Sequence, residues 1–148
     1  MIASRRIIIA IFMGFFSLAS IARGSQDTTL VDYICNPKEY ADGGFFSSNL
    51  EDVLEDVVFE TADNGYDYYA ESPDETEKAY AHGACNGALS SSECETCLRI
   101  ITTKLPDLCP NRYGARVRLK DCRLRNENAI TMIDQVAFAL NLCAAYMS

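Results

Sequence analysis

The sequence predicts an α+β fold, in which an antiparallel sheet of about five strands carries two helices on one face. Strand-like and helix-like segments follow one another in the order β-α-β-β-α-β-β, which suits two layers. Without its first 24 residues, the chain has about 124 residues, enough for one small domain with one core. Its seven cysteines are typical of a small secreted domain stabilised by disulfides.

Residues 1–24 are typical of a cleaved signal peptide and therefore predict a secreted, extracellular protein. Arg5 and Arg6 form a basic start, an apolar run follows at 7–18, and small residues offer a cleavage site near Gly24–Ser25. A membrane anchor is the alternative. About twelve apolar residues are too few to cross roughly 30 Å of hydrocarbon, so we expect no membrane span.

The first half of the domain predicts a strand and then a helix. Residues 28–35 are rich in β-forming side chains, and Asn36-Pro37 ends the strand. Ser48-x-x-Glu51 has the pattern of a capping box, in which the two side chains satisfy free backbone N–H groups at a helix start. The residues that follow form one apolar helical face: Leu50, Val53, Leu54, Val57 and Val58.

The second half predicts a hairpin, a helix and two final strands. After an Asn64-Gly65 turn, the strands 66–70 and 79–85 can pair as a hairpin. Ser92-x-x-Glu95 predicts a second capping box at the start of a helix, which Pro106 is expected to stop. Residues 113–119 and 122–127 read as the last two strands.

The charges are distributed unevenly along the chain. A net charge of −8 argues against nucleic acid as a partner, because phosphate neutralisation needs a basic surface. Residues 51–77 hold eleven Asp or Glu and no base, whereas residues 99–125 hold eight Lys or Arg. These segments can form two solvated faces of opposite sign, or the basic half can border a binding site.

The cysteines are centred on the pattern C-x8-C-x2-C formed by Cys85, Cys94 and Cys97. A zinc site would usually need a second closely spaced pair, and a redox dithiol would need a thioredoxin-like βαβ context. We therefore expect no metal and no cofactor. Six cysteines can pair in fifteen ways, and the seventh is left over.

Catalysis is not expected. The single histidine, His82, lies in a strand-like segment, and no serine or cysteine nucleophile with a partnered histidine can be assembled around it. No pair of carboxylates is marked out as a glycosidase pair. We therefore assign no catalytic residue.

Several motifs together resemble a plant family. They are the C-x8-C-x2-C pattern followed by Leu98, Phe46-x-x-Asn49-Leu50, Gly65-Tyr66-Asp67-Tyr68, Gly114-Ala115-Arg116-Val117, Asp121-Cys122 and Arg125-x-Glu127. The chain is similar over residues 28–127 to the cysteine-rich secretory domain of ginkbilobin-type antifungal proteins, cysteine-rich repeat secretory proteins and cysteine-rich receptor-like kinase ectodomains. This resemblance implies an apoplastic protein. It also implies the disulfides Cys35–Cys109, Cys85–Cys94 and Cys97–Cys122. The tail at 128–148 departs from the family pattern, and its role is unknown.

The resemblance further implies a mannose site formed by Asn36, Arg116 and Glu127. An amide, a guanidinium and a carboxylate together can donate to and accept from the hydroxyls of a hexose. Arg116 and Glu127 would lie roughly 36 Å apart on one extended strand, so we expect the chain to reverse near residues 119–121. Alternatively, Arg116 and Glu127 form a simple ion pair and Asn36 is a turn residue.

We therefore expect a secreted, mannose-binding, lectin-like protein with antifungal or defence activity. Its partners would be mannose-containing glycans, including those of cell-surface or fungal glycoproteins. The alternative function is an extracellular protein-interaction module, like the receptor ectodomains, with a vestigial sugar site.

The cysteine left over is Cys143, in the tail, where an apolar pattern suits a helix packed on the domain or a poorly ordered end. A free thiol in a secreted protein can pair between chains, which predicts a disulfide-linked homodimer. On non-reducing gels, the native chain should run as a dimer and Cys143→Ser as a monomer. Monomer bands for both would contradict the dimer.

Overall fold

The structure is a computed structural model that describes residues 25–128. The predicted signal peptide at 1–24, the tail from residue 129 and Cys143 lie outside the described residues. The described chain forms the elements β1 (Leu30–Cys35), α2 (Phe45–Glu60), β2 (Asp67–Glu71), β3 (Ala79–Cys85), α3 (Ser91–Leu108), β4 (Ala115–Leu119) and β5 (Cys122–Asn128). Their order is the predicted one.

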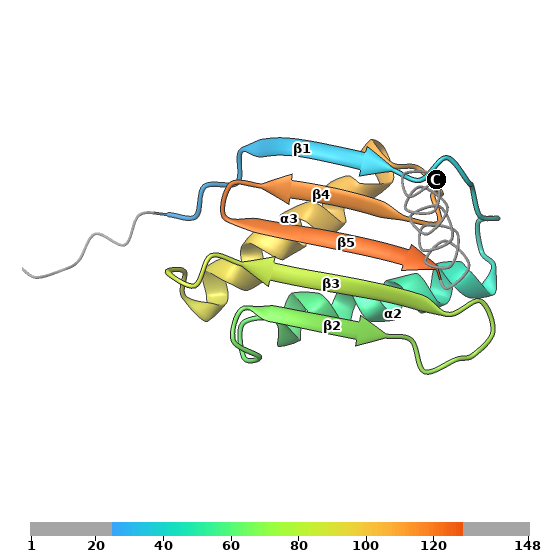
Figure 1. The fold of residues 1–148 in the computed structure, drawn as a ribbon, viewed down its shortest axis with the longest axis horizontal. Coiled ribbons are helices and arrows are strands. Elements are labelled where there is room, and N and C mark those ends of the chain that lie inside the picture. The colour runs from blue at the N-terminus through green and yellow to red at the C-terminus, as the bar shows by residue number, and fades with distance from the viewer. Residues whose placement is uncertain (1–24, 129–148) are drawn as a thin grey trace, which may run out of the picture.

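The strands form one antiparallel sheet, and both helices lie on one face of it (Figure 1). The strand order is β1-β4-β5-β3-β2, so β1 and β2 are the edges within residues 25–128. Helix α2 packs mainly on β2 and β3, whereas α3 crosses β3, β4 and β5. The predicted α+β fold is confirmed.

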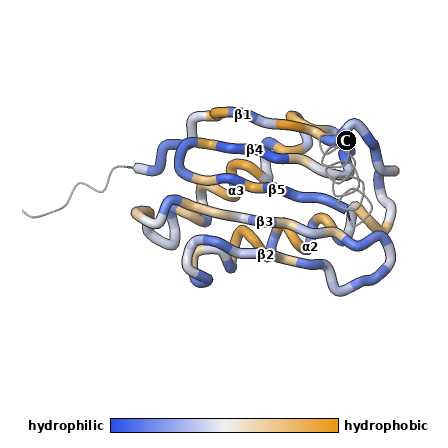
Figure 2. Tube along the Cα trace, viewed as in Figure 1, coloured by the Kyte–Doolittle hydropathy of each residue, from blue (hydrophilic) through white to orange (hydrophobic). Residues whose placement is uncertain are grey.

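The core lies between the sheet and the helices, where hydrophobic stretches of both helices face the strands (Figure 2). Successive side chains of a strand point to opposite faces. In β4, Ala115, Val117 and Leu119 are therefore buried under the helices, while Arg116 and Arg118 are exposed on the open face. The largest fully buried apolar side chains are Phe46, Leu98, Ile101, Leu119 and Leu124.

The start of α2 differs from the prediction. The helix begins at Phe45, after the N-cap residue Gly44, so Ser48 and Glu51 lie inside it and the predicted capping box is wrong. A carboxylate from the β2–β3 loop takes the capping role, because Glu77 Oε2 accepts a hydrogen bond from the Phe46 backbone N–H at 3.3 Å. A contact between segments thirty-one residues apart therefore sets this helix end.

The same loop also receives a buried side chain of α2. Asn49, 4% exposed, donates from Nδ2 to the carbonyl oxygen of Thr76 at 2.8 Å. On its other side, Glu77 accepts a hydrogen bond from the Tyr113 hydroxyl, and burial together with the Glu77 charge raises the pKa of Tyr113. These contacts attach the β2–β3 loop to helix α2 and to Tyr113, which lies just before β4.

Both ends of α3 also differ from the prediction. The capping box is formed by Ser90 and Glu93, two residues before the predicted pair Ser92 and Glu95. Pro106 does not stop the helix, which continues to Leu108. A proline removes one backbone donor, and the last turn is held here by a hydrogen bond from Cys109 N to Leu105 O.

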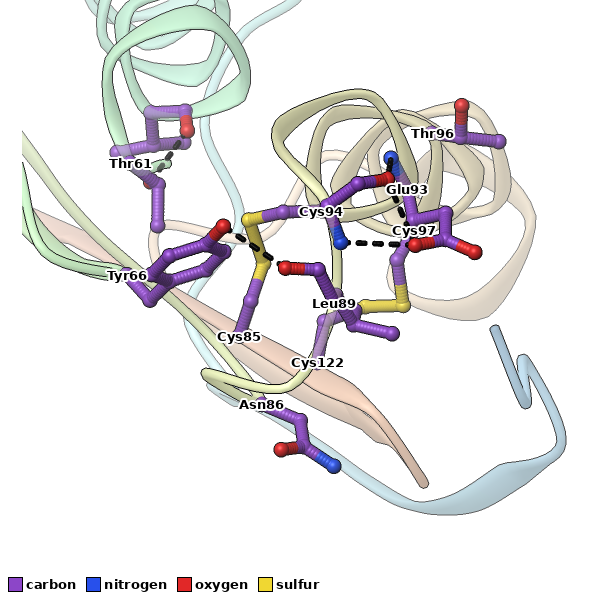
Figure 3. The surroundings of a disulfide bond; sticks show 12 residues. Thr61, Tyr66, Cys85, Asn86, Leu89, Glu93, Cys94, Thr96, Cys97 and Cys122 are labelled. Atoms are coloured by element: carbon purple, nitrogen blue, oxygen red, sulfur yellow. Dashed lines mark hydrogen bonds between the residues drawn. A yellow bond between two sulfur atoms is a disulfide. The ribbon is translucent and has the colours of Figure 1, made fainter. Parts of the chain in front are cut away.

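In residues 25–128 the structure contains three disulfides, Cys35–Cys109, Cys85–Cys94 and Cys97–Cys122, which are the pairs that the resemblance implies. Their Cα–Cα distances of 5.5, 5.7 and 6.1 Å lie in the normal range. Figure 3 shows the Cys85–Cys94 bridge joining the end of β3 to the start of α3, next to Cys97–Cys122. The Tyr66 hydroxyl donates to Leu89 O beside this bridge (Figure 3).

The three bridges close chain segments of very different length, which predicts different contributions to stability. Cys35–Cys109 joins residues 74 apart, and Cys85–Cys94 joins residues nine apart. Loop-closure entropy then predicts that Cys35→Ala with Cys109→Ala lowers the free energy of unfolding by about 2 kcal/mol more than Cys85→Ala with Cys94→Ala. Urea unfolding of both double variants measures the difference.

The two pairs are well matched for this comparison, because each has one buried and one half-buried sulfur-bearing residue. Equal losses, or a larger loss from the short loop, would contradict the entropic account.

Candidate functional site

The open face of the sheet, opposite the helices, carries four arginines. They are Arg116 and Arg118 of β4 and Arg123 and Arg125 of β5. Strand pairing places Arg116 opposite Arg125 and Arg118 opposite Arg123. Like charges directly opposite each other are destabilising, so this face needs acidic partners or anionic or hydroxylated ligands.

Acidic side chains accompany three of these arginines. Arg118 pairs with Asp32 at 2.7 Å, Arg125 with Glu127 at 2.7 Å, and Arg123 lies 3.9 Å from Asp67. Within residues 25–128, the guanidinium of Arg116 has no ion-pair or hydrogen-bonding partner. Arg116 therefore offers its donors to a ligand.

Arg116 lines a cavity of about 360 Å³ where three strands come together. The volume falls within the range of roughly 300–1,000 Å³ that is usual for small-molecule sites. Asn36 lies directly after β1, whereas Arg116 belongs to β4 and Glu127 to β5. The structure thus brings together all three residues that the sequence singled out.

The convergence of these residues depends on a reversal of the chain between β4 and β5. Strand β4 ends at Leu119, β5 begins at Cys122, and the two strands pair antiparallel. This is the reversal that the sequence predicts near residues 119–121. Asn36 joins them because β1 pairs with β4 in a register that places Cys35 opposite Ala115.

The side chain of Asn36 stabilises a turn through its oxygen and leaves its Nδ2 hydrogens to donate. Its side-chain Oδ1 accepts a hydrogen bond from the Lys38 backbone N–H at 2.8 Å, and its own backbone N–H donates to Gly114 O at 2.7 Å. The predicted turn role is therefore present. Because the oxygen is engaged, the side-chain N–H groups are what Asn36 can offer to a ligand.

Glu127 is buried and takes its ion pair from a different arginine than the sequence suggested. Its Oε2 accepts a hydrogen bond from Arg125 Nη2 at 2.7 Å, so the alternative of an Arg116–Glu127 pair is wrong. Residues 125 and 127 share a face because side chains alternate along a strand. Arg125 thus belongs to the site, and this alternation is the signal that could have found it.

Gly114 is a second residue of the site that the sequence analysis did not assign. A Cβ atom at this position would lie 3.1 Å from Asn126 O, 3.6 Å from Asn36 Cβ and 3.7 Å from Glu127 Cα. The absence of a side chain at Gly114 therefore lets β1, β4 and β5 approach closely around the cavity.

The cavity is rich in donors. The Arg116 guanidinium and the Asn36 amide donate, while the Glu127 carboxylate accepts and also holds Arg125. Two guanidinium groups and one carboxylate leave a local charge of about +1 at neutral pH. Such a set can orient a ligand by hydrogen bonds.

Among residues 25–128, no group of three or more His, Cys, Asp or Glu is placed to hold a metal ion. In the same residues, neither helix is both long enough and apolar enough to cross a bilayer.

The chain is similar in sequence to several plant proteins. Residues 34–129 match the family model described as salt stress response/antifungal. The chain is 36% identical over 112 residues to antifungal protein ginkbilobin-like protein 1 of Picea sitchensis, covering 74% of this chain and 84% of that protein. It is 32% identical over 121 residues to antifungal protein ginkbilobin-2 of Ginkgo biloba, covering 78% of this chain and 90% of that protein.

A solved structure shares the fold. It is the tandem DUF26 ectodomain of the cysteine-rich receptor-like protein PDLP8 from Arabidopsis thaliana, with a TM-score of 0.63 and 26% sequence identity. The match covers 68% of this chain and 48% of that ectodomain, so the chain spans about half the length of this tandem structure.

The close approach of the strands at Gly114 predicts that a larger residue at this position lowers the stability of the fold. In Gly114→Ala the new methyl group meets a backbone carbonyl at 3.1 Å, so the strands must shift. Overpacking of this kind predicts a loss of about 1–3 kcal/mol in the free energy of unfolding. Chemical denaturation measures it.

Gly87→Ala is the matched control, because a Cβ atom at Gly87 meets nothing within 4 Å among the described residues and Gly87 is not in the left-handed region. We expect this variant to be as stable as the wild type or slightly more stable. Equal losses in the two variants would contradict the account of Gly114.

Proposed function

Because the chain belongs to the salt stress response/antifungal family of plant cysteine-rich secretory domains, we propose that it is a non-catalytic lectin that binds mannose-containing glycans in plant defence. The protein is secreted and extracellular, in keeping with its disulfides and its likeness to a receptor-like ectodomain. The proposed location is the apoplast. The proposed targets include cell-surface or fungal glycoproteins.

The observation that carries the proposal is the shared cavity of Asn36, Arg116 and Glu127. A hexose presents neighbouring hydroxyl groups, each able to donate and to accept. Arg116 and Asn36 can donate to the hydroxyl oxygens, and Glu127 can accept a hydroxyl proton. Arg125 supports this arrangement, because its hydrogen bond orients the buried Glu127 carboxylate.

Burial strengthens the same argument. Glu127 is only 9% exposed, and a hydrogen bond between a ligand hydroxyl and a partly buried carboxylate is stronger than one in open water. Arg116 is exposed and unpaired within residues 25–128, so binding a sugar does not require an existing ion pair to break. The antifungal part of the proposal is supported by the names of the relatives from Picea and Ginkgo.

A second candidate function is an extracellular protein-interaction module. It is favoured by the edge strand β1, which exposes several large hydrophobic side chains. They are Leu30, Val31, Tyr33 and Ile34, which are 39%, 48%, 47% and 57% exposed. An exposed apolar edge strand can pair with a strand of another chain.

Substitution at the cavity tests the lectin proposal. Arg116→Ala and Glu127→Ala each remove a charged hydrogen-bonding group, which predicts a loss of about tenfold to a hundredfold in affinity for methyl α-mannoside. Isothermal titration with the refolded mature domain measures the affinity, and a glycan array measures the preference for mannose.

Arg118→Ala is the control, because Arg118 lies on the same face of β4 but pairs with Asp32 and does not line the cavity. It should bind mannose as the wild type does. A wild-type domain without mannose binding would contradict the lectin proposal and leave the interaction module. Inhibition of hyphal growth by wild type but not by Arg116→Ala would connect the site to defence.

A further inference from the structure

We propose a second sugar subsite on the open face of the sheet, adjoining the first across the Arg125–Glu127 ion pair. The ligand would then be an oligosaccharide of linked neutral hexoses rather than a single ring. This inference rests on the proposed function and extends it from a monosaccharide to a chain of sugars. It comes from a second cavity and from the side chains that surround it.

The second cavity has a volume of about 240 Å³ and shares Arg125 and Glu127 with the first. Its other polar and aromatic lining residues are Tyr69, Glu71, Tyr80 and His82. Because the same ion pair borders both cavities, the two cavities adjoin each other at Arg125 and Glu127.

Strand register explains this adjacency. Tyr69 of β2 lies opposite His82 of β3, and His82 lies opposite Arg125 of β5. Arg125 in turn lies opposite Arg116 of β4, so these four residues form one row across the sheet. With strands about 4.8 Å apart, Tyr69 and Arg116 are separated by three strand spacings, roughly 14 Å. One sugar ring is too short to contact both ends of this row.

Tyr69 gives the second cavity an aromatic wall. It is 72% exposed, and its ring stacks on that of His82 with centroids 3.9 Å apart and an interplanar angle of 1°. His82 is itself held in place, because its Nε2 lies 2.9 Å from Asp67 Oδ1. The stack with His82 on the neighbouring strand therefore fixes one face of the Tyr69 ring, although Tyr69 lies on an edge strand.

A supported, exposed aromatic ring suits a sugar. One face of a mannose ring carries mainly C–H groups, which lose contact with water when they pack on an aromatic surface. The hydroxyl groups at the rim of the sugar would meet polar atoms of the same cavity. Tyr80 lies opposite Glu127 in the β3–β5 pairing and opposite Glu71 in the β2–β3 pairing.

The shared carboxylate can serve both subsites. A carboxylate has two oxygens with about four acceptor positions, and the hydrogen bond from Arg125 Nη2 goes to Oε2. The Oε1 atom can accept from a hydroxyl on one side, and the second lone pair of Oε2 can accept on the other. In this arrangement, Arg125 holds Glu127 in place between two consecutive sugar rings.

The experiment compares one sugar with three. Isothermal titration measures the affinities of methyl α-mannoside and of a linear α-mannotriose for the full mature chain. We expect the wild type to bind the trisaccharide more tightly than the monosaccharide. Tyr69→Ala should weaken trisaccharide binding by about twofold to tenfold, as expected for one lost aromatic contact, and leave monosaccharide binding unchanged.

Three further variants make the comparison specific. Tyr69→Phe keeps the ring and should retain trisaccharide binding, while Arg116→Ala should weaken binding of both sugars. Tyr33→Ala removes an exposed tyrosine of β1 that lines neither cavity, and should change neither affinity.

An independent readout avoids substitutions. In NMR spectra of the wild type, the trisaccharide should shift the backbone amides of residues 69–71 and 80–82, and the monosaccharide should not.

The outcomes separate the two proposals. If methyl α-mannoside binds but Tyr69→Ala leaves trisaccharide affinity unchanged, or weakens both sugars equally, the second subsite is overturned and the lectin proposal stands. If neither sugar binds the wild type, both proposals are overturned.

Discussion

The site depends on the attachment of strand β1 to the rest of the domain. No residue of β1 is fully buried, so hydrophobic packing alone does little to hold this edge strand. It is held by pairing with β4 and by the Cys35–Cys109 bridge to the end of α3. Asn36 follows directly on that bridge, and its backbone N–H donates to Gly114 O. A crosslink to the end of a helix therefore helps to position Asn36, which lines the cavity of about 360 Å³.

The two faces of the sheet differ in polarity, because successive side chains of a strand point to opposite faces. In β4 and β5, the residues that point to the helices are buried, and the intervening arginines point to solvent. Within residues 25–128, the helices thus cover the apolar face of the sheet and leave the face with the arginines open. Four of the eight Lys or Arg residues in 99–125 lie on this face. Two arginines of this basic segment, Arg116 and Arg125, line the cavity.

Local patterns predicted the elements well and their ends less well. Alternation and helical periodicity indicated all five strands and both helices, because each pattern follows from local backbone geometry. The start of α2 was predicted at Ser48, yet Glu77 from a distant loop caps the helix earlier. Likewise Pro106 suggested a stop, whereas the hydrogen bond from Cys109 to Leu105 carries the helix to Leu108. Helix ends are decided by whichever partner satisfies the free backbone groups, and that partner need not be local.

The sequence by itself determined the element order and, through its motifs, the family, the disulfide pairs and three residues of the cavity. Those features are encoded in spacings along the chain. Only the tertiary structure decided that Glu127 pairs with Arg125, that Arg116 stays unpaired within the described residues, and that Gly114 lets three strands meet. It alone placed Tyr69 on His82 beside the same ion pair. These features depend on strand register, which joins residues that are remote in sequence.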